Sequence, residues 1–415
     1  MGDVYIIGAS MTPFGRFLDT SVKQLTHRAV HEAMTDAKLA QEIVGAAYFS
    51  NTTQGVIEGQ YLVPGEIALR EMGFEGIPMV NVENACASAS SAFHGAYLSI
   101  KAEMTDVALA IGADKMYDQD KDLSFAIFDG AWDVHNVAGT IAGLDAMGEG
   151  VKPPPGTHIP NGKRSPFMDV YANFAKYHMK TFGSTQAQLA AVAAKNHHHS
   201  TMNPLSQYRD DYSVDDIMGA RIVSWPLTLP MCSPISDGAA AAILCSEDYL
   251  SQLDENVRAR AIKISACELG TGTNRKIDEF DKHLTHLAAK RAYDRAGIAP
   301  EDISVAEVHD ATAFGEITQT ENLGFCKFGQ GGRLAEQGET SIGGRIPINP
   351  SGGLESKGHP IGATGLSQIY ELVTQLRGEA GARQVEDASY AIAENGGGIY
   401  GIEESVCCIT ILARS

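Results

Sequence analysis

The sequence predicts an α/β protein built from two related halves, and three observations support this prediction. Strand-like runs alternate with helical patterns along most of the chain, as they do in mostly parallel sheets that helices cover on both faces. Two segments, residues 26–50 and 285–309, align without a gap. About a hundred residues rich in Gly, Pro, Met and aromatic side chains interrupt the alternation, which is too long for a plain connector.

The aligned segments each contain an amphipathic helix, a polar turn and a β-rich run. They read THRAVHEAMTDAKLAQEIVGAAYFS and THLAAKRAYDRAGIAPEDISVAEVH. Thr26 matches Thr285, and alanines three or four positions apart recur in both helices, which gives each a small-residue face suited to close packing. Because the match continues through the turn and the strand, we expect a duplicated α/β unit rather than a chance similarity of two Ala-rich helices.

The remaining elements fit an N-terminal half, 1–250, and a C-terminal half, 258–415. The first half contains, in order, the strand VYIIGAS, a helix over 21–38, AAYFSN, MVNVEN, the helix after Cys86, DVALAIGAD and AAAAILCSED. The second half contains AIKISACEL, a helix over 280–297, SVAEVH, the helix after Gly362, ASYAIAE and SVCCITILA. The insertion, about 117–225, is expected to be a lid or a substrate-binding subdomain.

Composition narrows the class of protein. A chain of 415 residues exceeds the roughly 250 to 300 at which a single core stops growing, so two or more domains are expected. Neither a signal-type leader nor an apolar span of about 18 residues occurs, which predicts a cytoplasmic protein without a membrane helix. The net charge of −19 disfavours nucleic-acid binding. Seven cysteines without a CxxC pair predict reduced thiols. The adjacent histidines at 197–199 cannot all face one ion from a helix, so no metal site is expected.

Cys86 differs from the other cysteines in its setting. The strand-like run MVNVEN leads through a tight turn to Cys86, and SASSAFHGAYLSI continues as a helix of small residues. Helix N–H groups and the macrodipole stabilise a thiolate at this position, and a backbone N–H can point at an attacked carbonyl. We therefore expect Cys86 to be a nucleophile. The other six cysteines lie in apolar or strand-like runs and are expected to pack as small hydrophobic side chains.

A nucleophilic cysteine needs a base, and two histidines lie in unusual contexts. His359 is part of the Gly-rich stretch NPSGGLESKGHPIGATG, just before a helix. This stretch lacks the lysine and the spacing of a phosphate-binding P-loop. His309 ends the strand-like run SVAEV, where catalytic residues of α/β folds tend to lie. Each histidine alone is a weak signal, since an ordinary turn can carry a surface histidine.

Together, five motifs resemble those of the thiolase superfamily. NACASAS resembles the nucleophile motif, HDATAF the His-Asp loop, ISDGAAA the start of the domain-closing strand, GHPIGATG the Gly-His-Pro loop and ENGGG the C-terminal glycine loop. They follow the family order across nearly the whole chain. The His-Asp form is most similar to the sterol-carrier-protein-type and archaeal acetoacetyl-CoA thiolases. The resemblance implies two βαβαβαββ halves in a five-layered α/β/α/β/α core, with an inserted loop domain that binds CoA.

The resemblance also implies substrates, partners and residue roles. It implies acyl-CoA substrates, no permanently bound cofactor and a tight homodimer, often paired into a tetramer. Cys86 would be the acylated nucleophile and His359 would take its proton. The N–H groups of Cys86 and Gly396 would hold the thioester oxygen, and His309 with His359 would polarise the carbonyl of the second acyl-CoA.

One departure from the family pattern concerns a second cysteine, which normally moves the α-proton of the substrate. The family places it after His-Asp or in the C-terminal loop, where this chain has Ala311 and either Glu394 or Asn395. Glu394 or His309 could replace it, because a dry pocket raises the pKa of a carboxyl group toward neutrality. The departure puts reversible, non-decarboxylating chemistry in doubt, though not acyl transfer.

Three functions therefore compete. The favoured one is a thiolase-like acyl-CoA C-acyltransferase that forms or cleaves 3-ketoacyl-CoA. The second is a decarboxylating, ketoacyl-synthase-like enzyme, for which Cys86, His309 and His359 suffice because decarboxylation itself generates the enolate. The third is a thiolase-fold subunit that is active only with a zinc-ribbon/OB-fold partner protein.

Overall fold

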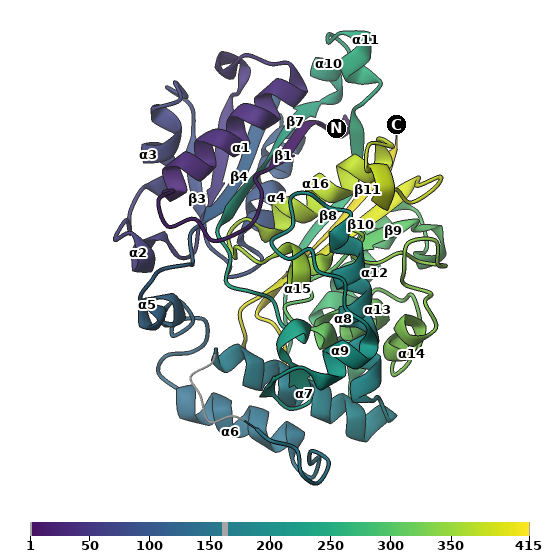
Figure 1. The fold of residues 1–415 in the computed structure, drawn as a ribbon. Helices are drawn as coiled ribbons and strands as arrows, with labels where there is room; N and C mark the ends of the chain where they lie inside the picture. Colours follow the sequence, from purple (N-terminus) through teal and green to yellow (C-terminus); the bar gives the residue numbers. More distant parts are fainter. Residues whose placement is uncertain (1, 160–164, 415) are drawn as a thin grey trace.

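A mixed nine-stranded sheet forms the centre of the protein (Figure 1). The computed structural model describes residues 2–159 and 165–414. The strands of the N-terminal half are β1 (Val4–Met11), β2 (Ala46–Ser50), β3 (Met79–Val82), β4 (Val107–Asp114) and β7 (Gly238–Ser246). Those of the C-terminal half are β8 (Ile262–Thr271), β9 (Val305–Glu307), β10 (Tyr390–Gly397) and β11 (Val406–Arg414).

The two halves repeat one strand order outward from a short junction between β1 and β8. The N-terminal half runs β1-β7-β4-β2-β3 and the C-terminal half runs β8-β11-β10-β9, followed by a bridge from Ala306 to Ile348. Successive neighbours are antiparallel, antiparallel, parallel and parallel in both halves. This is the duplication that the aligned segments predicted. The expectation of mostly parallel sheets is wrong, because the last strand of each half runs antiparallel to both its neighbours.

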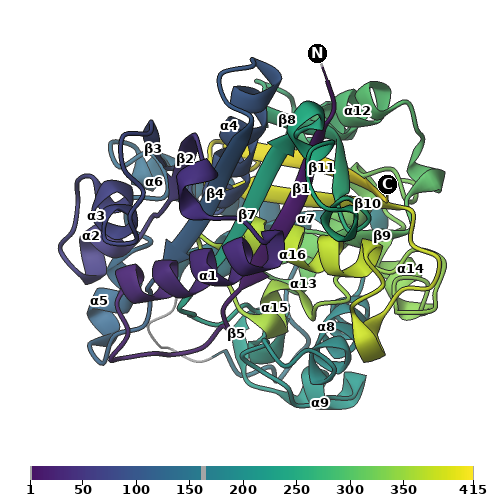
Figure 2. The same cartoon turned by 90° about the horizontal axis from the view of Figure 1, so that it is seen from above.

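Helices separate and cover the two half-sheets in five layers (Figure 2). Helix α1 (Val22–Ala37) packs on β1 and β7, and α12 (Leu284–Ala296) packs on β8 and β11. Helices α4 (Ser88–Lys101) and α16 (Thr364–Leu376) lie between the half-sheets and contact each other. Three buried apolar clusters fill the spaces between these layers. The predicted α/β/α/β/α architecture is confirmed.

Small residues allow the two central helices to approach closely. Ala89, Ala92 and Ala96 of α4 are fully buried. A Cβ atom on Gly365 of α16 would lie only 2.0 Å from the Ser90 hydroxyl oxygen. The run of Ala and Ser after Cys86 therefore serves a helix that is buried on all sides over residues 88–93.

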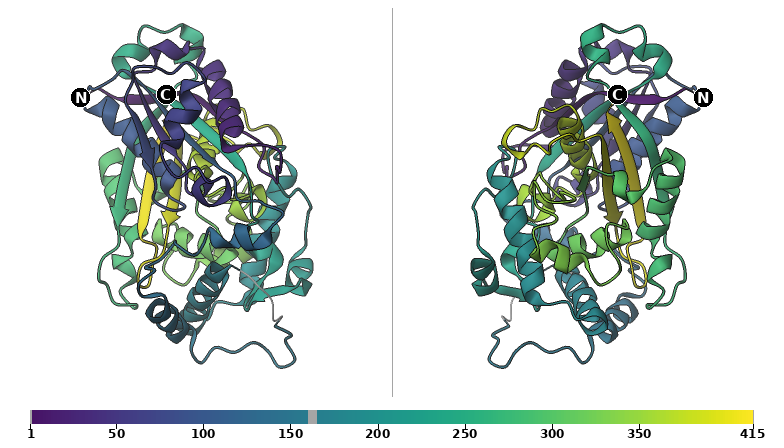
Figure 3. Two further views of the ribbon diagram at one scale, coloured as in Figure 1. Left: turned by 90° about the vertical axis from the view of Figure 1, so that its left-hand side faces the viewer. Right: turned by 90° about the vertical axis from the view of Figure 1, so that its right-hand side faces the viewer.

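The insertion lies between β4 and β7, at one end of the molecule, away from α10 (Glu247–Leu250) and α11 (Glu255–Arg258) (Figure 3). Its elements are α5 (Lys121–Ala126), α6 (Val137–Gly148), α7 (Pro166–Phe182), α8 (Gln186–Thr201), α9 (Val214–Gly219), β5 (Ile222–Ser224) and β6 (Leu227–Thr228). The C-terminal half packs against α8 with α13 (Ala313–Asn322), α14 (Gly331–Glu336) and α15 (Gly353–Lys357). None of the described helices combines the length and apolar character needed to cross a membrane.

Candidate active site

Cys86 lies in a strained turn between β3 and α4. The residue before it, Ala85, has φ of 49°, in the left-handed region that non-glycine residues rarely adopt. The Ala87 N–H donates to the Asn84 carbonyl over 3.1 Å, and the Ser88 hydroxyl donates to the Ala85 carbonyl over 2.6 Å. These bonds stabilise the turn, and Cys86 lines a cavity of the protein.

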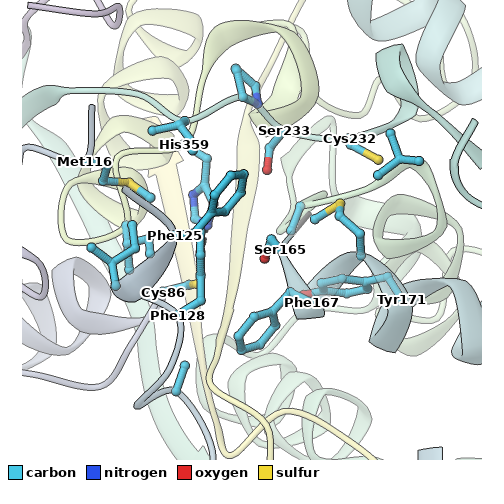
Figure 4. A pocket seen from close by; sticks show the side chains of 18 of the residues that line it. Cys86, Met116, Phe125, Phe128, Ser165, Phe167, Tyr171, Cys232, Ser233 and His359 are labelled. Atoms are coloured by element: carbon cyan, nitrogen blue, oxygen red, sulfur yellow. Dashed lines mark hydrogen bonds between the residues drawn. The ribbon is translucent and has the colours of Figure 1, made fainter. Parts of the chain in front are cut away.

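This cavity has a volume of about 750 Å³, within the ~300 to 1,000 Å³ typical of small-molecule sites. Cys86 of the N-terminal half and His359 of the C-terminal half line it together (Figure 4). His309 of the C-terminal half also belongs to its wall. The exposed residues Arg16 and Arg221 also belong to its wall. The insertion contributes much of the apolar and aromatic surface through Phe125, Phe128, Phe167, Met168 and Tyr171. Both halves and the insertion therefore meet at one site.

His359 meets Cys86 in the tautomer that a base requires. The His359 Nε2 atom lies 3.3 Å from Cys86 Sγ, and its Nδ1 atom lies 2.7 Å from the Thr364 hydroxyl oxygen. The Thr364 hydroxyl donates its own hydrogen to the Pro360 carbonyl over 2.9 Å, so its oxygen accepts the Nδ1 proton. Nε2 therefore presents its lone pair to the Cys86 thiol.

His309 lies two residues after the end of β9 and completes the group. The His309 and His359 ring centroids are 5.3 Å apart, and ligand-type atoms of Cys86, His309 and His359 all lie within 4.8 Å of one another. Burial lowers the pKa of His309 to about 4. Burial, together with His309 and Lys357, lowers the pKa of His359 well below its ordinary value. Both imidazoles are therefore neutral at pH 7.

The same three residues are the one group of this kind, among the described residues, whose atoms are close enough to hold a metal ion. One nitrogen of His359 is directed to Cys86 and the other to Thr364. This pairing is typical of a nucleophile with its base.

A buried polar network fixes the loop that carries His309. The Asp310 carboxylate accepts the Leu354 N–H over 2.8 Å. The Asn196 amide of α8 donates to Asp310 and to Glu355, over 3.1 Å in each case. Asn196, Asp310 and Glu355 are all fully buried. The insertion thus supports the His309 loop and the segment that leads to His359.

The Cys86 thiol is held in its neutral form. Burial raises the pKa of Cys86 to about 12, against the opposing effect of the Gly398 N–H and its own N–H. The expected thiolate is not favoured, because α4 begins only at Ser88, two residues after Cys86, and burial disfavours the charged form of the thiol. Cys86 and His359 therefore form a neutral S–H···N pair, in which the proton moves during attack.

The C-terminal glycine loop reaches the sulfur through Gly398. This residue lines the cavity and its N–H contacts the Cys86 sulfur. Gly396 lies beside the His309 ring, since a Cβ atom on Gly396 would be 3.3 Å from His309 Nδ1. The Glu394 carboxylate accepts the backbone N–H of His309 over 2.9 Å, and Glu394 is not part of the cavity wall formed by the described residues. The structure therefore brings Cys86, His309 and His359 together. Gly396 and Glu394 lie next to His309.

The adjacent histidines of α8 point in different directions. His197 and His199 are buried, and each bonds a backbone carbonyl, at distances of 3.1 and 3.0 Å. His198 is exposed and pairs with Asp211. They form a packed helix end, as expected.

The sequence did not single out Thr364 or Gly398. Thr364 lies within the quoted motif GHPIGATG, but a hydroxyl residue near a helix start is common. Gly398 is one of three consecutive glycines, and the sequence does not indicate which N–H faces the sulfur. The five-residue spacing from His359 to Thr364 is the one signal that could have pointed to the bond between them.

Two family models match the chain. "Thiolase, N-terminal domain" matches residues 4–214, and "Thiolase C-terminal domain-like" matches residues 274–411. The chain is 36% identical over 402 residues to an acetyl-CoA acetyltransferase of Methanothermobacter thermautotrophicus, covering 97% of this chain and 98% of the relative. It is 36% identical over 402 residues to sterol carrier protein 2 of Bos taurus, covering 94% of this chain and 69% of the relative.

A solved structure shows the same fold. The Ltp2-ChsH2(DUF35) aldolase superposes with a TM-score of 0.74 at 21% identity, over 100% of this chain and 98% of that chain. The matches to both family models span most of the sequence, and the site contains a paired cysteine and histidine. The chain therefore belongs to the thiolase family and is an acyltransferase of the thiolase type.

Proposed function

We propose that this protein is an acyl-CoA C-acyltransferase that forms or cleaves 3-ketoacyl-CoA through an acyl-enzyme on Cys86. The observation that carries the proposal is the 3.3 Å contact between Cys86 Sγ and His359 Nε2, with the tautomer of His359 fixed by Thr364. A nucleophile with an adjacent, oriented base is the arrangement that covalent acyl transfer requires. This is the function that the sequence motifs favoured.

Acylation begins when the Cys86 sulfur attacks the thioester carbonyl. The thiol proton passes to His359 Nε2, and His359 then gives it to the departing CoA sulfur. The N–H groups of Cys86 and Gly398, which lie beside the Cys86 sulfur, would hold the oxygen on which negative charge develops. Because the thiol and the imidazole start neutral, no charge has to be buried before substrate binds.

The finer assignments remain predictions. These are the homodimer or tetramer, the cytoplasmic location, the length of the acyl group and the direction of the reaction. The third alternative, a subunit active only with a zinc-ribbon/OB-fold partner protein, is kept as a proposal, since the similar solved aldolase is named together with a second protein. Ala311 lies in the cavity wall, at a place where the family has the cysteine that moves the α-proton, so the decarboxylating alternative stays open. Product analysis with acetyl-CoA and with malonyl-CoA separates this alternative from the favoured reaction.

Intact-mass spectrometry after incubation with acetyl-CoA tests the acyl-enzyme. We expect one acetyl group on the wild type and none on Cys86→Ala, with the same unfolding temperature. Cys232→Ala is the matched control, because Cys232 is a buried thiol in the wall of the same cavity. Label on Cys232, or on any cysteine other than Cys86, would contradict the proposal.

A further inference from the structure

The residues at the places of the family's second cysteine cannot reach the substrate as bases. Ala311 lines the cavity but has no ionisable group. Glu394 accepts the backbone N–H of His309, and Asn395 accepts the Ser90 hydroxyl over 2.8 Å. Neither residue is part of the cavity wall formed by the described residues. Another group must therefore take the α-proton.

His309 lies where a base for the α-proton is needed, and its ring nitrogens are available for hydrogen bonding to a substrate. It lines the cavity and is only 2% exposed, and neither of its ring nitrogens has a hydrogen-bond partner of good geometry among the described residues. One of its ring nitrogens lies within 4.8 Å of the Cys86 sulfur and of a ring nitrogen of His359. A buried polar group without a partner is costly unless a ligand or substrate supplies one.

The surroundings of the ring favour a proton on Nδ1. That atom is the one beside Gly396, since a Cβ atom on Gly396 would lie 3.3 Å from it. The Gly396 backbone also raises the pKa of His309 against the effect of burial, which a carbonyl does when it attracts a ring N–H. Nε2 is then the unprotonated nitrogen and is available to a substrate.

We propose that His309 Nε2 is the base that removes the α-proton of the second acyl-CoA, and this proposal rests on the proposed function. The α C–H bond breaks, an N–H bond forms on Nε2 and the electron pair becomes the enolate. The enolate carbon attacks the acyl carbonyl on Cys86, so that a C–C bond forms and the C–S bond breaks. The His309 imidazolium then returns its proton to the Cys86 thiolate.

The surroundings also stabilise the imidazolium formed in this step. The Gly396 carbonyl attracts the Nδ1 proton and so raises the pKa of His309 against the effect of burial. The enolate itself is an anion in contact with Nε2–H. His359 is left free for Cys86, so that each histidine serves one reacting atom.

Exchange of the α-hydrogens of acetyl-CoA in deuterated water tests the proposal, with acetylation of Cys86 followed in parallel. The decisive variant is His309→Asn, whose amide keeps an N–H donor but has no basic nitrogen. We expect exchange to fall about 100-fold or more, within the ~10² to 10⁴ that a positioned base supplies, while acetylation persists. Adding Ala311→Cys to this variant should restore part of the exchange, because residue 311 borders the same cavity.

Each other outcome decides between the two proposals. Exchange that persists in His309→Asn makes His309 a donor only and overturns the inference. Acetylation of the wild type without exchange also overturns it, and the acyl-enzyme stands. Exchange without acetylation, lost in His309→Asn, supports the inference and contradicts the acyl-enzyme. If neither occurs, both proposals fail.

Glu394→Gln is the matched comparison, because it removes the ionisable carboxyl group, whose pKa burial raises to about 8, but leaves the imidazole. We expect a smaller loss of exchange than in His309→Asn. Complete loss in Glu394→Gln, with exchange intact in His309→Asn, would assign the base to the carboxylate.

Discussion

At the scale of single residues, the Thr364 hydroxyl fixes the tautomer of His359. It accepts the Nδ1 proton over 2.7 Å and donates to the Pro360 carbonyl. Thr364→Val removes the acceptor, so that the proton can move to Nε2, the nitrogen that must receive the thiol proton. We expect acylation of Cys86 to slow about 10- to 100-fold, part of the ~10² to 10⁴ that a positioned base supplies.

Stopped-flow release of CoA in a single turnover measures this step. Thr364→Ser keeps the hydroxyl and should stay close to the wild-type rate. Equal rates in the valine and serine variants would show that the bond does not orient the base.

The residues of the site could be predicted where a motif marks them. Cys86, His309 and His359 follow from their motifs and come together in the structure. The motif ENGGG does not indicate that Gly398 rather than Gly396 faces the sulfur, because adjacent N–H groups of a glycine loop point in different directions. The pKa of Cys86 could not be predicted either, since it depends on how completely the other half and the insertion exclude water.

At the scale of elements, the contact between α4 and α16 depends on Gly365. A Cβ atom there would lie 2.0 Å from the Ser90 hydroxyl oxygen and 2.7 Å from the Ser90 backbone nitrogen. Because the backbone cannot move away without shifting α4, we expect Gly365→Ala to reduce the free energy of unfolding by about 2 to 3 kcal/mol.

Denaturant unfolding followed by circular dichroism measures this change. Gly143 of α6 is the control, since a Cβ atom there meets no described residue within 4 Å. Gly143→Ala should stabilise the protein by about 0.5 to 1 kcal/mol through helix propensity. A neutral Gly365→Ala variant would mean that the central helices can separate without cost.

Some elements of the fold could be predicted from short stretches of sequence, and others depend on residues far apart in the chain. The aligned helices and strands were predictable because hydrophobic and small-residue periodicity is a local property of the sequence. The direction of β7 and β11 was not, because it depends on how the chain returns after the insertion and after the turn that follows β10. The packing of α13, α14 and α15 against α8 also joins segments far apart in the sequence.

At the scale of the whole molecule, a chain with a net charge of −19 has to bind the phosphates of CoA through local positive groups. Arg221 lies in the insertion, is exposed and borders the cavity. Arg16 also borders the cavity but lies over the Tyr117 ring, 5.1 Å from its centroid. We therefore expect Arg221 to contribute more of the attraction for the nucleotide.

Arg221→Ala should weaken binding of acyl-CoA about 5- to 20-fold, as expected for the loss of one exposed charge-assisted bond of about 1 to 2 kcal/mol. The KM for the matching acyl-pantetheine, which has no nucleotide phosphates, should not change. Arg209→Ala is the control, because Arg209 belongs to the same insertion but donates to the Thr201 carbonyl and does not border the cavity. Steady-state kinetics with both thioesters at two salt concentrations measure these effects. Equal losses with acyl-CoA and acyl-pantetheine would place Arg221 at the acyl group rather than at the phosphates, and would remove the electrostatic role assigned here to the insertion.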